Sequence, residues 1–207
     1  MIKVSIYIPL YNQHELIIRA LDSIPARDDI EIIVCDDGST DGSHEAVLEW
    51  LSRNPGREIS LMRNETNKGP GYTCNRCLDL CKGEYVYEMD SDDYLYTDEW
   101  VKALEWLRGA DLVYVNGRIN SGEVLRQSPE KKMLWCAPWF KFMRREFLGD
   151  HRYPEDKLQV DWYLNNDIQA LPHSEKYTDL VAYHYNFPRD GSITWPYING
   201  KVDQRWM

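Results

Sequence analysis

The stretch "EYVYEMDSDDYL" at residues 84–95 joins an apolar run to a dense group of acids. Residues 84–89 are typical of a buried strand, and Asp90, Asp92 and Asp93 follow it directly. Carboxylates this close repel one another unless a cation lies among them, and hard oxygen ligands suit Mg²⁺ or Mn²⁺. Alternatively, the aspartates cap the next helix and stay solvated. The stretch alone leaves both interpretations open.

Upstream of this stretch, apolar runs and polar loops alternate in a regular order. Residues 2–9 and 30–35 predict strands, and each is followed by a polar loop and an amphipathic helix. Asn12, with Glu15 three residues later, predicts the N-terminal cap of the first helix. Further strands are predicted at 58–62 and 111–117. This alternation predicts an α/β domain with a mostly parallel central sheet, right-handed crossovers and helices on both faces.

Downstream of residue 117 the pattern is less regular. Residues 118–127 predict a hairpin that turns at Ser121-Gly122, and residues 135–148 are aromatic and basic. A helix is predicted at about 160–171 and a strand at 179–187. An earlier helix is predicted from Thr97 to Arg108, with Gly109 as its stop.

The composition limits the class of protein. A chain of 207 residues with 43% hydrophobic residues is expected to form one domain, and no apolar run reaches the length of a membrane span. A net charge of −10 disfavours a nucleic-acid partner. The odd count of five cysteines favours a reducing compartment, and we expect a cytoplasmic protein. Cys74, Cys77 and Cys81 lie on one apolar helix face, which favours core packing over a zinc site.

Three polar clusters follow predicted strands: "PLYN" at 9–12, "DDGSTD" at 36–41 and "DSDD" at 90–93. Ligands of open parallel sheets bind outside the carboxyl ends of the strands. We therefore expect the three clusters to lie at the same edge of the sheet, which we call the rim. Asp36 and Asp37 fit either a turn and helix cap or hydrogen bonds to a base or ribose, and Tyr11 offers a ring for stacking. The sequence lacks a P-loop, an EF-hand and a complete dinucleotide fingerprint.

Three segments together resemble the family 2 glycosyltransferases, which have the GT-A fold of nucleotide-sugar enzymes. The segments are "VSIYIPLYN" (4–12), "IIVCDDGSTDGS" (32–43) and "NKGPGYTCNRCLDLCKGEYVYEMDSDDYL" (67–95). Weaker likeness continues in residues 137–148, 153–164 and 183–194. The resemblance implies a single Rossmann-like GT-A domain over 1–207, with a nucleotide-sugar-binding half at 1–115 and an acceptor-binding half at 116–207.

For the donor side, the resemblance implies roles for residues at the rim. Pro9 and Tyr11 would flank the nucleobase, and Asp37, or its neighbour Asp36, would bind the base. Asp90 and Asp92 match a D-x-D element that contacts the ribose and a Mn²⁺ or Mg²⁺ ion, with Asp93 as an additional ligand. The residues expected to act on the phosphates or the metal from the closing loop are Arg189, Ser192 and His184, although His184 also fits a core residue.

For the acceptor side, the family's inverting mechanism implies a carboxylate base, and Asp161 matches its position. Val160 replaces the glutamate that usually precedes this aspartate, which leaves Asp156 as a rival base. Asp161 also fits a simple helix cap. The aromatic residues expected to line the acceptor site, or to pack in the core, are Trp135, Trp139 and Phe140. Lys141 matches a basic position of the family without an assigned role.

The leading hypothesis is a metal-dependent inverting glycosyltransferase that uses a nucleoside diphosphate sugar, with a UDP-sugar favoured. Its acceptor would be a glycan, a lipid-linked molecule, a protein or a small molecule. A nucleotidyltransferase is the second hypothesis, but "IPLYNQHE" at 8–15 lacks the glycine-rich basic signature of that class. The third is a non-catalytic nucleotide-sugar-binding module, which would not need Asp161.

Overall fold

Nine strands form one sheet in the computed structural model, which describes residues 1–57, 59–129, 137–157 and 160–189. The strands are β1 (Val4–Leu10), β2 (Ile30–Asp36), β3 (Ile59–Arg63), β4 (Tyr85–Glu88), β5 (Tyr94–Leu95), β6 (Leu112–Ile119), β7 (Val124–Leu125), β8 (Lys141–Arg144) and β9 (Glu175–Tyr185). The helices are α1 (His14–Ser23), α2 (Ser43–Arg53), α3 (Pro70–Leu78), α4 (Thr97–Ala103), α5 (Arg145–Leu148) and α6 (Val160–Gln169), with a 3₁₀ turn η2 at Pro138–Phe140.

The strands follow the order β3-β2-β1-β4-β8-β6-β9-β5, and β7 pairs with β6. The first four strands of this order are mutually parallel, as predicted. β8 then inserts antiparallel between β4 and β6, and β5 pairs antiparallel with β9. Sequence patterns missed β5, which at two residues is too short to show a period, and β8, which lies within the aromatic and basic stretch 135–148 and shows no strand-like alternation.

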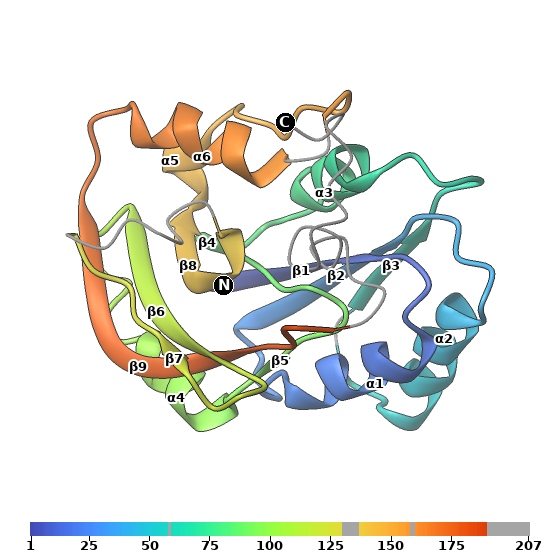
Figure 1. The fold of residues 1–207 in the computed structure, drawn as a ribbon. Coiled ribbons are helices and arrows are strands. Elements are labelled where there is room, and N and C mark those ends of the chain that lie inside the picture. The colour runs from blue at the N-terminus through green and yellow to red at the C-terminus, as the bar shows by residue number, and fades with distance from the viewer. Residues whose placement is uncertain (58, 130–136, 158–159, 190–207) are drawn as a thin grey trace.

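Two layers of helices enclose the sheet, with α1, α2 and α4 on one side and α3, α5 and α6 on the other (Figure 1). Successive residues of β2 enter opposite cores: Ile32 and Val34 pack with the first layer, whereas Ile33 and Cys35 pack with the second. A strand covered on both faces needs apolar side chains on both, which explains the unbroken apolar run at 30–35. The prediction of helices on both faces is confirmed.

Strand β1 lies at the point where the order of the sheet reverses, because the chain adds β2 and β3 on one side of it and β4 on the other. The register aligns Leu10 with Asp36, and Tyr7 with Glu88, so the carboxyl ends of these strands meet at one edge. Ligands of open α/β sheets bind at such a reversal. The fold therefore gathers the loops after β1, β2 and β4 at one rim.

Two predicted helix limits were wrong. The first helix begins at His14, and Asn12 takes a left-handed φ of 51° and accepts a hydrogen bond from the Thr40 amide (2.9 Å) instead of capping the helix. Helix α4 ends at Ala103, because the amides of Leu104 and Trp106 bond three residues back, to Val101 and Ala103. Asn12 bonds to the loop after β2 instead of capping its own helix, so a tertiary contact overrode the capping signal. At the end of α4 the chain tightens into a turn with 3₁₀-type hydrogen bonds, so the helix ends before the predicted stop at Gly109.

Candidate active site

An acidic cluster of Asp90, Asp92 and Asp93 lies at the rim, directly after β4. One carboxylate oxygen from each residue lies within 4.8 Å of those from the other two. Burial, followed by the charges of Asp93 and Asp92, raises the pKa of Asp90 well above its usual value. A divalent cation would relieve this repulsion and match the preference of Mg²⁺ and Mn²⁺ for carboxylate oxygens. The donor set of the cluster therefore fits a hard divalent cation.

The three aspartates have different partners. Asp93 is fully buried, and its two oxygens accept hydrogen bonds from the Tyr183 hydroxyl (2.7 Å) and the Asn186 amide (2.8 Å). Asp92 forms an ion pair with Arg189 at 2.7 Å. The Asp90 carboxylate has no hydrogen-bond partner within the described ranges, although the Asp90 amide donates to Tyr183 (3.1 Å). Asp93 anchors the loop to β9, whereas Asp90 keeps its oxygens available for a ligand.

The loop after β2 carries Asp36 and Asp37, the two candidates for the base contact. Asp36 is fully buried, accepts a hydrogen bond from the Ser39 amide and forms an ion pair with Arg63 at 3.2 Å. Asp37 is 4% exposed and accepts hydrogen bonds from the amides of Lys68 (2.8 Å) and Gly69 (2.9 Å), at the start of α3. Both carboxylates therefore hold the rim loops together.

The nucleobase candidates Pro9 and Tyr11 belong to the adjacent strand end. Pro9 lies in β1 opposite Cys35, and Tyr11 follows the strand with 45% of its surface exposed. The two loops are joined by a hydrogen bond from the Asn12 amide to the Ser39 hydroxyl (2.9 Å). An exposed ring beside this junction is available for stacking.

Asp161 lies in the first turn of α6, and burial together with the charge of Glu88 raises its pKa well above the usual value. Its carboxylate has no hydrogen-bond partner in the part of the chain that the structure describes. The rival Asp156 is exposed and forms an ion pair with Lys157 at 3.3 Å. Asp161 is partly buried, and a carboxyl with a raised pKa holds a proton more readily near neutral pH than a solvated one, which supports Asp161 over Asp156 as the candidate base.

Glu88, at the end of β4, is a buried carboxyl that sequence reasoning missed. It accepts hydrogen bonds from the hydroxyls of Tyr7 (2.6 Å) and Tyr153, and burial raises its pKa. Lys141, fully buried at the start of β8, opposes that rise for Glu88 and for Asp161. The sequence did contain a signal for Glu88, because an acidic residue at the end of an otherwise apolar strand indicates a carboxyl at the edge of the sheet.

The remaining candidates are less well placed for the predicted roles. His184 uses both ring nitrogens, toward the Tyr96 hydroxyl (3.0 Å) and the Asn120 side chain (2.9 Å), and stacks on Tyr94. Metal binding would break one of these bonds. Trp139 is partly buried and packs against Tyr185, with ring centroids 5.6 Å apart. Trp135 and Ser192 lie outside the described residues.

The cysteines predicted to pack in the core do so. Cys74, Cys77 and Cys81 are buried on the α3 side of the sheet, in the same cluster as Cys35. Among the described residues, the one group of three potential metal ligands is the acidic cluster, which contains no cysteine.

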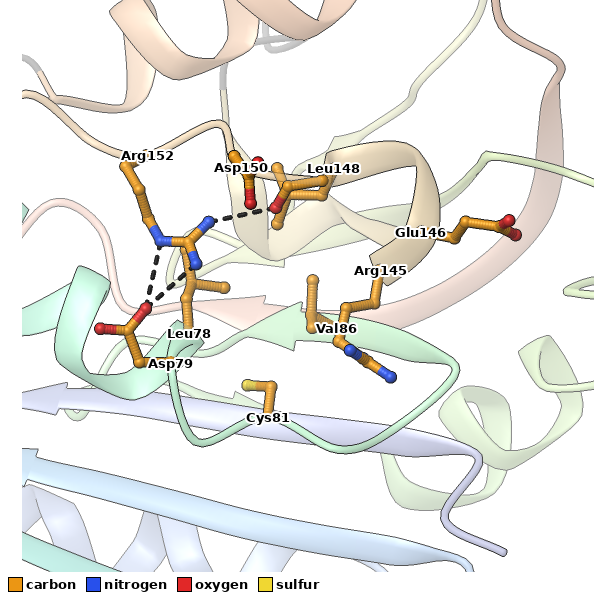
Figure 2. Close-up of a pocket in the computed structure, with 10 residues that line it drawn as sticks. Leu78, Asp79, Cys81, Val86, Arg145, Glu146, Leu148, Asp150 and Arg152 are labelled. Carbon is orange, nitrogen blue, oxygen red and sulfur yellow. Dashed lines mark hydrogen bonds and ion pairs between the residues drawn. The ribbon is translucent and has the colours of Figure 1, made fainter.

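A cavity of about 360 Å³ lies elsewhere, between the end of α3, β4 and α5 (Figure 2). Arg152 at its wall is paired with Asp79 at 3.0 Å, and Arg145 donates to the main-chain oxygen of Gly83 (2.8 Å). None of the predicted site residues lines this cavity. The candidate site residues lie at the rim and not in this cavity.

Comparison with known proteins places this fold and site in a family. The sequence model described as glycosyl transferase family 2 matches residues 5–159. The chain therefore belongs to glycosyltransferase family 2, as the sequence motifs predicted.

A relative that matches most of the chain is an uncharacterized glycosyltransferase of Haemophilus influenzae. It is 31% identical over 206 residues, which cover 92% of this chain and 80% of the relative. Four other curated relatives are far longer, and the match spans between 10% and 15% of their length. Within the described part of the chain, no helix has the length and apolar character needed to cross a membrane.

Solved structures share the fold at low sequence identity. Staphylococcus aureus TarS 1–349, in complex with UDP-GlcNAc, superposes with a TM-score of 0.79 at 24% identity, covering 92% of this chain and 60% of that one. A mannosyltransferase of Pyrobaculum calidifontis, in complex with GDP-Man and Mn²⁺, gives 0.76 at 22% identity, covering 93% and 59%. These likenesses confirm the GT-A fold.

Proposed function

We propose that this chain transfers a sugar from a nucleoside diphosphate sugar, with a UDP-sugar favoured, to an acceptor hydroxyl with inversion at the anomeric carbon. The observation that carries the proposal is the acidic cluster, which lies at the reversal point of a sheet belonging to a glycosyltransferase family. Two fold neighbours were solved with nucleotide sugars, and one of them also with Mn²⁺.

On the donor side, Asp90, Asp92 and Asp93 would hold a Mn²⁺ or Mg²⁺ ion against the diphosphate. The bound ion would neutralise the charge that develops on the leaving group. Arg189, already paired with Asp92, could move to the phosphates of a bound donor. Asp37, Pro9 and Tyr11 are the proposed nucleoside contacts. We leave out Asp36, because it is fully buried and paired with Arg63.

On the acceptor side, Asp161 would take the proton of the acceptor hydroxyl. The acceptor oxygen then forms a bond to the anomeric carbon while the bond from that carbon to the phosphate oxygen breaks. The electron pair leaves on the diphosphate, which needs no proton when its charge is neutralised. A carboxyl whose pKa is raised by burial suits this transfer, because it binds the proton more readily than a solvated one.

Turnover of UDP-sugars tests the proposal. The purified chain is mixed with Mn²⁺ and UDP-GlcNAc, related UDP-sugars or GDP-mannose, and release of the nucleoside diphosphate is measured. We expect release by the native chain, and a loss of about 100-fold or more in Asp161→Asn, the range typical of general bases. Asp156→Asn is the matched control and should stay near the native rate.

Two results would contradict the proposal. Donor binding without turnover by the native chain, and no effect of Asp161→Asn, would instead support a non-catalytic binding module. Equal activity loss in Asp156→Asn and Asp161→Asn would remove the assignment of the base.

A further inference from the structure

Lys141 is a cation that the fold buries completely. The residue opens β8, where it pairs with Tyr114 of β6, and its side chain has no exposed surface. Burying an ammonium group strongly destabilises a fold unless charges and hydrogen bonds compensate it. A lysine in such a position therefore depends on its partners, and the identity of these partners indicates its role.

The contacts of Lys141 lead to the first turn of α6. Its ammonium nitrogen donates a hydrogen bond to Asn165 Oδ1 and lies 5.6 Å from the centre of the Tyr114 ring. Asn165 in turn donates through Nδ2 to the main-chain oxygen of Asp161 at 2.7 Å. Asn165 is itself fully buried, so this link is shielded from water. Lys141 thus fixes the turn that carries Asp161.

Lys141 also interacts electrostatically with two carboxyls, the buried Glu88 and the partly buried Asp161, and lowers the pKa of each against the effect of burial. Glu88 already has two hydroxyl donors, Tyr7 and Tyr153. Among the described residues, the other titratable groups that interact with Asp161 are Tyr153, Cys74 of α3 and Asp90. None of these three carries a positive charge, so within this part of the chain Lys141 supplies the favourable charge for Asp161.

We propose that Lys141 is a positioning residue for Asp161: through Asn165 it holds the first turn of α6, and its charge favours the ionised form of the Asp161 carboxylate, which can accept a proton. The inference rests on the proposed role of Asp161 as the base. It gives Lys141 a role in the acceptor half of the proposed reaction.

Removing the charge tests this role. Lys141→Met keeps most of the side-chain volume and leaves Glu88 and Asp161 without their cation. We expect kcat to fall about tenfold or more, which matches a one-unit rise in the pKa of the base. The affinity for UDP with Mn²⁺ should stay within twofold. The melting temperature should also fall, because Glu88 loses a neutralising charge.

A double variant separates this role from a purely structural one. In Lys141→Met/Glu88→Gln both buried charges are gone, whereas the glutamine oxygen still accepts a hydrogen bond from the tyrosines. We expect the melting temperature to recover toward that of the native chain while kcat stays below that of the matched single variant Glu88→Gln. Recovery of kcat together with stability would overturn the inference, because Lys141 would then serve only to neutralise Glu88. The double variant also covers the case in which Lys141→Met alone does not fold.

A titration of Asp161 gives a readout that does not depend on turnover. The ¹³C carboxyl signal of Asp161, assigned by its absence in Asp161→Asn, is followed against pH in Glu88→Gln and in the double variant, which differ only at Lys141. We expect the signal to titrate at a higher pH in the double variant. The same titration pH in both proteins would overturn the inference. If the native chain turned over no nucleotide sugar, the proposed function would fail while the titration still decided the effect of Lys141.

Discussion

At the scale of single residues, Asp90 and Asp93 lie in the same loop but have different structural roles. Asp93 is fully buried and holds the hydroxyl of Tyr183 and the amide of Asn186, so it joins the loop after β4 to β9. Asp90 is only partly buried and has no side-chain hydrogen bond among the described residues. The same residue type in adjacent positions thus serves the fold in one case and is available to a ligand in the other.

Substitution at these two positions should separate stability from metal binding. Asp93→Ala leaves the Tyr183 hydroxyl and the Asn186 amide without their acceptor, and should cost about 2–3 kcal/mol of unfolding free energy. Asp90→Asn keeps the shape but removes a charge, and should abolish the Mn²⁺-dependent part of UDP affinity with little loss of stability. Urea unfolding and titration calorimetry with and without Mn²⁺ measure the two effects. Unchanged UDP affinity in Asp90→Asn would refute the metal assignment.

At the scale of elements, helix α3 is held closely against the segment that precedes α6. A Cβ on Gly71 would lie 2.2 Å from the main-chain oxygen of Pro154. Asn75, one turn later, donates to the Tyr153 oxygen (2.9 Å) and accepts from the Tyr153 amide (2.9 Å). Tyr153 in turn reaches Glu88 of β4 with its hydroxyl. These contacts fix the path of the chain toward Asp161.

Gly71→Ala tests this close approach. Glycine to alanine within a helix normally adds up to about 1 kcal/mol of stability. Here the methyl group meets backbone that cannot easily move, so we expect a loss of about 1–3 kcal/mol instead. Thermal unfolding decides the sign. A higher melting temperature in Gly71→Ala would show that α3 and residue 154 are not in close contact in solution.

At the scale of the whole molecule, one sheet carries both halves of the proposed reaction. The parallel strands β1 to β4 present the nucleotide-side loops, and β8, β6 and β9 extend the sheet toward α6 and the acceptor side. β6 crosses the boundary predicted between the two halves at residue 115, so the halves share strands. The rim also concentrates acids with raised pKa values, namely Glu88, Asp90, Asp93 and Asp161.

This concentration of acids predicts how stability depends on pH. A carboxyl whose folded-state pKa is raised contributes stability below its unfolded value of about pH 4, and loses it as the pH rises through the folded value. Without metal, the melting temperature should therefore fall from about pH 5 toward neutrality. Mn²⁺ should reduce this decline, because a bound cation favours the ionised form of Asp90 and Asp93. Calorimetric scans across this range, with and without Mn²⁺, provide the measurement.

Asp90→Asn is the matched control for the pH profile, since it removes one of the coupled charges. Its melting temperature should decline less steeply with pH, and Mn²⁺ should change it less than it changes the native chain. A native profile that rises from pH 5 to neutrality in the absence of metal would contradict the expectation.

The sequence by itself determined the parallel half of the sheet, the position of the acidic cluster and the family. Long apolar runs show their period locally, and the motifs at 4–12, 32–43 and 67–95 are contiguous in the chain. Only the tertiary structure showed that Asp156 is exposed while Asp161 is partly buried, gave His184 other partners, and brought Glu88 and Lys141 together beside Asp161. Glu88 and Lys141 lie on β4 and β8, which pair antiparallel across a separation of more than 50 residues. A contact of that kind leaves no local periodicity, so it becomes visible only when the sheet is assembled.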